Sequence, residues 1–263
     1  MYPTSRVPGS LLLAAVLAAS LSVAAITARA DARAAFAQVR PVVERSVVMV
    51  KVAAFPQVRV RGVIQPPRQF DLEGPATVIA PGVIVSSLSI FDPVKSLPPR
   101  EGVEFSTTMY SKVEILVDGA TWIEGRSTAT VEGDDLIFFA TAKEADAARL
   151  PALAIAAEPT PEVFADYLDV TRAPAAFERC AIARVSTITG HVPTGTFIFV
   201  TAQSAGSPVV DTNGAMLGLG VRVSGQANMP ATSALMPAAR VLASAREKGV
   251  LPAAVPPAAA SAP

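Results

Sequence analysis

Hydrophobic residues along most of the chain form short runs rich in β-branched side chains, separated by turn-forming pairs such as Pro81-Gly82 and Asp118-Gly119. Such runs are typical of strands, because branched side chains pack well on a pleated surface. In the first half they predict strands over residues 46–52, 77–80, 83–87, 113–117, 121–125, 127–131 and 136–140. In the second half they predict strands over 163–168, 180–185, 196–201, 209–210 and 215–223. Many short strands with turns between them indicate an all-β barrel or sandwich.

Four segments depart from this pattern. Residues 34–45 have helical spacing interrupted by Pro41, which predicts at most a short helix leading into a strand. Prolines and arginines without a clear period predict a loop over residues 55–73. Strong helix formers predict a helix over 238–248, and the Ala/Pro-rich residues 249–263 lack the apolar bulk to pack.

The N-terminus has the features of a secretory signal peptide. Arg6 precedes an apolar run over residues 11–26, and small residues follow in Ala28-Arg29-Ala30. This order predicts that residues 1–30 are removed before Asp31, which would place the protein in a bacterial periplasm or outside the cell with no stable membrane span. The alternative is an uncleaved anchor, but a run of 16 residues is shorter than the roughly 20 that a membrane span needs.

Charge and chemistry exclude several function classes. Without residues 1–30 the chain holds 20 basic and 22 acidic residues, a balance that argues against a nucleic-acid partner. One histidine and one cysteine cannot assemble a usual zinc or iron site, and no glycine-rich phosphate loop precedes a helix, so we expect no metal and no cofactor. We expect Cys180, which lies among Ala181, Ile182 and Ala183, to be a buried small hydrophobic residue.

Residues 203–211, Gln-Ser-Ala-Gly-Ser-Pro-Val-Val-Asp, resemble the nucleophile loop of the trypsin-like serine proteases, above all their HtrA (Deg) branch. In that family the loop is Gly-Asn-Ser-Gly-Gly-Pro-Leu-Val, followed by a turn and a strand. Alignment on Pro208 matches Gly206 and puts Ala205 at the position of the attacking serine. Gln203 and Ser207 then replace the two flanking glycines.

Two further segments are similar to the same family. Residues 74–87 resemble the hairpin that leads to the catalytic histidine, and the register puts Ser89 at the histidine position. Residues 133–139 resemble the family's Asp-Leu-Ala-Val-Leu strand and put Asp135 at the triad aspartate. The resemblance covers about residues 36–248 and implies an all-β fold of two trypsin-like antiparallel β-barrels with a short C-terminal helix. The implied divisions are 31–155 and 156–235 for the barrels, 236–248 for the helix and 249–263 for a tail.

The same register implies that proteolysis has been lost. Serine at position 89 is no base at neutral pH, and Ala205 has no oxygen for attack. Asp135 would remain as a carboxylate that accepts a hydrogen bond from Ser89. Side chains at 203 and 207 make a preformed oxyanion hole less favourable, since glycine permits conformations that other residues resist.

A relocated catalytic pair is the alternative. His191 is the single histidine of the chain and lies in a Gly/Pro-rich segment that we predict to be a turn of the second barrel. It would have to serve Ser204 or Ser207, whereas the family's base comes from the first barrel. Three hypotheses therefore stay open: a pseudoprotease that binds an extended peptide or an envelope protein by strand addition, a serine endopeptidase with a non-standard catalytic set, and a structural envelope module.

Overall fold

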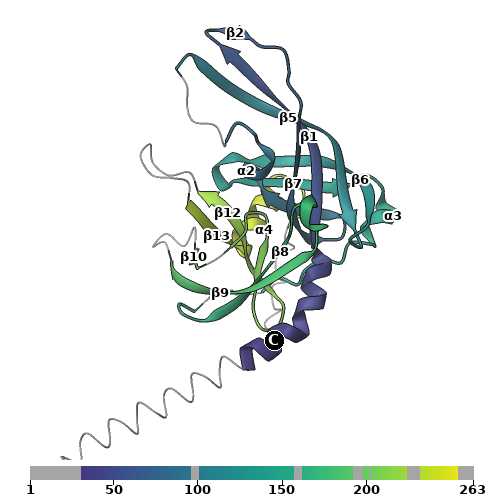
Figure 1. Cartoon of the computed structure of the whole chain (residues 1–263), viewed down its shortest axis with the longest axis vertical. Coiled ribbons are helices and arrows are strands. Elements are labelled where there is room, and N and C mark those ends of the chain that lie inside the picture. Colours follow the sequence, from purple (N-terminus) through teal and green to yellow (C-terminus); the bar gives the residue numbers. More distant parts are fainter. Residues whose placement is uncertain are drawn as a thin grey trace, which may run out of the picture.

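The computed structural model describes residues 31–95, 101–156, 162–191, 198–201, 203–223 and 232–253, without the side chains of residues 107, 191 and 232. Two antiparallel β-barrels lie side by side (Figure 1). The first comprises β1 (Val47–Val60), β2 (Val63–Ile64), β3 (Phe70–Ala80), β4 (Val83–Ser87), β5 (Val103–Val117), β6 (Thr121–Val131) and β7 (Leu136–Thr141). It closes in the order β1-β3-β4-β7-β6-β5 because β5 also pairs with β1.

The second barrel closes in the order β10-β13-β12-β11-β8-β9. Its strands are β8 (Asp166–Arg172), β9 (Ala181–His191), β10 (Ile198–Val200), β11 (Pro208–Val210), β12 (Met216–Val223) and β13 (Thr232–Pro237). The remaining short elements are α2 (Leu88–Phe91), η1 (Glu132–Asp134), α3 (Glu144–Ala147), η2 (Ala175–Phe177) and α4 (Ala238–Glu247). A helix over residues 31–46 precedes β1.

Three groups of buried side chains hold this arrangement together. One fills the first barrel and includes Ile84, Ile115 and Phe139, and a smaller one fills the second barrel. The third joins the two barrels through Phe138 and Leu219, and it also packs against helix 31–46 and α4. Burial of apolar area is the dominant favourable contribution to folding, so this shared core fixes how the barrels face each other.

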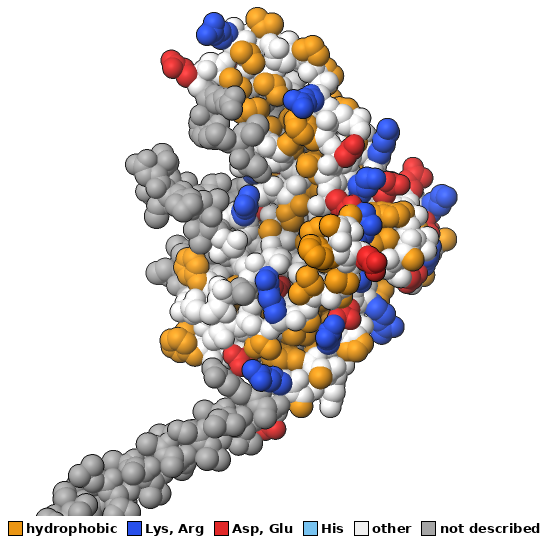
Figure 2. All heavy atoms as spheres, viewed as in Figure 1, with side chains coloured by type: hydrophobic (Ala, Val, Ile, Leu, Met, Phe, Trp, Pro, Cys, Tyr) orange, Lys and Arg blue, Asp and Glu red, His pale blue; other side chains and the backbone are white. Residues whose placement is uncertain are grey.

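Residues 55–73 form mostly strand, so the predicted loop is wrong over most of its length. β1 continues to Val60, turns at Arg61-Gly62 and returns through β2, while β5 pairs with it from Val103 onward. The three strands form a ribbon that projects from the barrel (Figure 1), with hydrophobic side chains gathered over it (Figure 2). The pattern could not reveal this ribbon because its pairing partners lie some 45 residues further along the chain.

Other local predictions need correction. The helix runs without a break through Pro41 because Phe36 and Val43 bury its apolar face in the shared core, and this packing outweighs the loss of one backbone hydrogen bond. Cys180 is exposed, not buried, because it follows the exposed η2 turn outside the barrel. Within the described part of the chain, no helix combines the length and hydropathy that crossing a membrane requires.

Candidate functional site

The carboxylate of Asp135 lies where the two barrels meet. Its Oδ1 accepts hydrogen bonds from the backbone N–H of Ser89, at 2.8 Å, and from the Ser89 hydroxyl. Its Oδ2 accepts from the hydroxyl of Ser87 and, at 2.8 Å, from the backbone N–H of Arg222 at the end of β12. Four donors from both barrels therefore converge on one buried carboxylate.

Local backbone geometry aims this side chain. Asp135 follows η1 with a φ of 54°, in the left-handed region that Asp and Asn tolerate better than most residues. Its carbonyl accepts from the N–H of Leu88, the first residue of α2. The two barrel-1 segments that carry Ser89 and Asp135 are thus held together by main-chain and side-chain hydrogen bonds.

The loop over residues 203–207 packs against the same face of the first barrel. Gly206 has a φ of 77°, and its carbonyl accepts a hydrogen bond from the Thr77 hydroxyl at 3.2 Å. A Cβ atom there would collide with the Pro75 carbonyl and the Ser86 hydroxyl. Only glycine satisfies both the backbone conformation and this close approach.

Gly206 also faces Ile90, the residue after Ser89. Ala205 precedes Gly206 in the loop, so the structure brings the loop that carries Ala205 against the α2 segment that carries Ser89, and Ser89 in turn contacts Asp135. Convergence of three segments so distant in sequence is a tertiary property. No local pattern could produce it.

The side chains of Gln203 and Ser207 both occupy buried space at the loop. Both polar atoms of the Gln203 amide are buried and have no hydrogen-bond partner within the described residues. Ser207 is fully buried, and its hydroxyl donates to Thr171 at 2.8 Å. Space that glycines would leave open is therefore filled by side chains.

Neither serine of the alternative catalytic pair is free. Ser207 is sequestered as described, and the Ser204 hydroxyl accepts a hydrogen bond from Arg184 at 2.7 Å. A positively charged donor stabilises the hydroxyl as an acceptor but cannot take its proton. The backbone of His191 belongs to the end of β9, opposite Ile198, instead of the predicted turn, and its side chain lies outside the described residues.

Arg184 joins this loop to a buried acid of the second barrel. Its Nε donates to Asp169 Oδ2 at 2.6 Å. Burial raises the pKa of the Asp169 carboxyl to about 6, although the hydrogen bond and charge of Arg184 act to lower it. Sequence reasoning missed Asp169, Arg184 and Thr171, because their link to residues 204 and 207 depends on strand pairing across the barrel.

At the three positions that resemble a catalytic triad, none of the described side chains is a free proton acceptor. Among the described side chains, Asp135 has its lone pairs occupied by four donors, Ser89 is bonded to Asp135, and Ala205 is inert. General-base activation of a nucleophile needs a basic group within hydrogen-bond reach of it.

Comparison with solved structures identifies the architecture. The chain superposes on the Rv3671c protease from M. tuberculosis in its active form with a TM-score of 0.51 and 18% identity, over 84% of this chain and 86% of that one. The fold is that of the trypsin-like serine proteases. An inactive serine-to-alanine mutant of Rv3671c gives a TM-score of 0.51 at 17% identity, over 82% and 93% of the two chains.

A serine endoprotease from Yersinia pestis has a TM-score of 0.54 at 15% identity, over 81% of this chain and 66% of that one. No protein-family model and no curated protein sequence matches the chain. The predicted two-barrel trypsin-like fold with a short C-terminal helix is therefore confirmed by structure.

Proposed function

We propose that this protein is an exported, catalytically inactive member of the trypsin-like fold, which binds an extended peptide or an envelope protein segment in the cleft between its barrels. One observation carries the proposal: at the point where the loop carrying Ala205 meets the first barrel, Asp135 is saturated by Ser89, Ser87 and Arg222. The groups of a catalytic triad are replaced by a closed hydrogen-bond network.

The retained aspartate fits this proposal. A carboxylate that ties β12 to the η1–β7 junction stabilises the cleft whether or not it serves a catalytic base. A chain without the histidine and the serine lacks a base and a nucleophile, whereas a chain without Asp135 would lose the hydrogen bonds that join the two barrels. A rigid cleft without a nucleophile can hold an extended chain and leave it intact.

The first experiment measures activity with a fluorophosphonate active-site probe and a mixed peptide library. We expect no labelling and no detectable cleavage, because enzymes stripped of triad residues retain at most about 10³- to 10⁴-fold over water, and here the loop glycines are also replaced. Active trypsin serves as the positive control. Robust cleavage that disappears on His191→Ala and on Ser204→Ala or Ser207→Ala would instead establish a relocated catalytic pair.

A second experiment measures binding by fluorescence anisotropy of labelled extended peptides from the same library. Ser89→Trp places a bulky side chain beside Asp135, and we expect it to abolish peptide binding. Ser106→Trp, an exposed position on the projecting ribbon, is the matched control and should bind as the unaltered protein does. Equal binding by both variants would locate any peptide site outside the cleft.

A further inference from the structure

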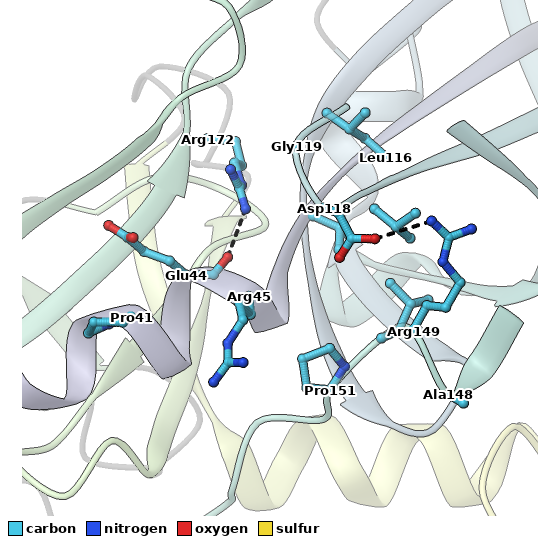
Figure 3. Close-up of a pocket in the computed structure, with 13 residues that line it drawn as sticks. Pro41, Glu44, Arg45, Leu116, Asp118, Gly119, Ala148, Arg149, Pro151 and Arg172 are labelled. Carbon is cyan, nitrogen blue, oxygen red and sulfur yellow. Dashed lines mark hydrogen bonds and ion pairs between the residues drawn. The ribbon is translucent and has the colours of Figure 1, made fainter. Parts of the chain in front are cut away.

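A cavity of about 550 Å³ lies where the C-terminal end of helix 31–46 faces the β5–β6 turn and the segment that follows α3 (Figure 3). It shares no lining residue with the Ser89–Asp135 network or the 203–207 loop. Cavities of this size accommodate small organic ligands. We propose that it binds a small amphipathic carboxylate, that is, one carboxylate group on a short aliphatic body.

Three arginines line the cavity, namely Arg45, Arg149 and Arg172. Arg149 is paired with the exposed Asp118 at 3.1 Å. Arg45 is exposed and has no ion-pair partner among the described residues. In Figure 3, Arg45 projects from the end of the helix on one side of the cavity, and Arg149 lies on the other side with its guanidinium turned toward Asp118.

Arg172 is held rigidly at the wall. Its Nε donates to the Val47 carbonyl and its Nη2 to the Glu44 carbonyl, both at 2.8 Å, so it caps the end of helix 31–46. The Glu44 carboxylate instead pairs with Arg40 and points away from Arg172 (Figure 3). Arg172 is therefore a half-buried cation without an ion pair among the described residues; burial lowers its pKa, although the charge of Glu44 acts to raise it.

The charge balance of the cavity and the side chains of its walls indicate which kind of ligand it would bind. Asp118 pairs with Arg149, and Glu44 pairs with Arg40 outside the cavity, so the positive charges of Arg45 and Arg172 are left to favour an anionic group. The remaining walls are largely aliphatic, with two exposed prolines and four Val and Leu side chains that are almost fully buried. These side chains are Pro41, Val48, Leu116, Val117, Leu150 and Pro151. Aliphatic walls favour an apolar body, while the arginines orient its acidic end.

Octanoate is a suitable probe, with octan-1-ol and octylammonium as chain-matched controls. Binding to the full-length mature protein would be measured by calorimetry and by backbone amide shifts in ¹H–¹⁵N spectra. We expect saturable octanoate binding with shifts centred on Gly119 and Ala148, which line the cavity, and much weaker effects from the alcohol and the amine.

Arg45→Gln tests the charge without disturbing Asp118 or the helix cap. We expect it to weaken octanoate binding about tenfold or more, as loss of a charge-assisted hydrogen bond does. Arg126→Gln, an exposed arginine of β6 outside this cavity, should leave the affinity unchanged. The proposal is overturned if octanoate gives no saturable shifts at these amides, if octan-1-ol binds equally well, or if Arg45→Gln binds octanoate like the unaltered protein.

Discussion

Replacement of Asp135 by alanine tests whether this acid is a structural element of the junction between the barrels. The substitution removes the acceptor of four hydrogen bonds, two of them from the backbone N–H groups of Ser89 and Arg222. The hydroxyls of Ser87 and Ser89 can rotate toward other acceptors, but the two N–H groups cannot. The variant therefore leaves buried donors without partners at the junction of the barrels.

The expected loss of unfolding free energy follows from the number and type of these hydrogen bonds. A hydrogen bond to a charged group contributes about 1.5–3 kcal/mol, and such values are not additive within one network. Alanine is also disfavoured at a φ of 54° by about 1 kcal/mol. We expect Asp135→Ala to lower the free energy of unfolding by about 3–5 kcal/mol. Asp135→Asn, which keeps the shape but turns an amide N–H₂ toward one of the donors, should cost about 2–3 kcal/mol.

The assay is urea unfolding followed by circular dichroism, with the slope compared between variants to confirm two-state behaviour. Asp118→Ala is the matched control, because Asp118 also has a left-handed backbone, with a φ of 52°, but is exposed and makes only a surface ion pair with Arg149. We expect the Asp118→Ala control to lower the free energy of unfolding by about 1–2 kcal/mol. If Asp135→Ala is no more destabilising than Asp118→Ala, the network does not hold the barrels together and the argument for a structural aspartate fails.

Two further predictions concern pH and export. Because burial raises the pKa of Asp169 to about 6 from its ordinary 3.8, the folded state binds that proton more tightly than the unfolded chain, and the associated stability is present below pH 4 and lost as the pH rises through 6. Asp169→Asn should therefore gain in unfolding free energy relative to the unaltered protein between pH 4 and 7, and a constant difference across urea titrations in this range would contradict the expectation. N-terminal sequencing of protein from an envelope or culture fraction should begin at or near Asp31, and a chain that still starts at Met1 in the cytoplasm would refute export.

Much of the candidate site could be located from sequence because it lies in short motifs. Gly206 and Pro208 match the family's nucleophile loop, and the Asp135-Leu136 pair matches its Asp-Leu strand, so each short segment places one candidate position. What those positions contact could not be found in this way. Thr171 and Arg184 lie 36 and 20 residues from the loop serines they bond, on strands whose register local periodicity does not encode.

By itself the sequence determined the all-β class, the turns at Pro81-Gly82 and Asp118-Gly119 and the absence of a serine at 205, because β-branched runs, turn chemistry and residue identity are local properties. Tertiary structure alone decided that β1 and β5 pair into a projecting ribbon, that helix 31–46 continues through Pro41, and that Arg172 caps that helix from 128 residues away. Each of these depends on packing and hydrogen bonds between segments far apart in the chain, which bury apolar faces and satisfy backbone groups. Local pattern contains no information on those contacts, so the cavity beside Arg172 becomes visible only in three dimensions.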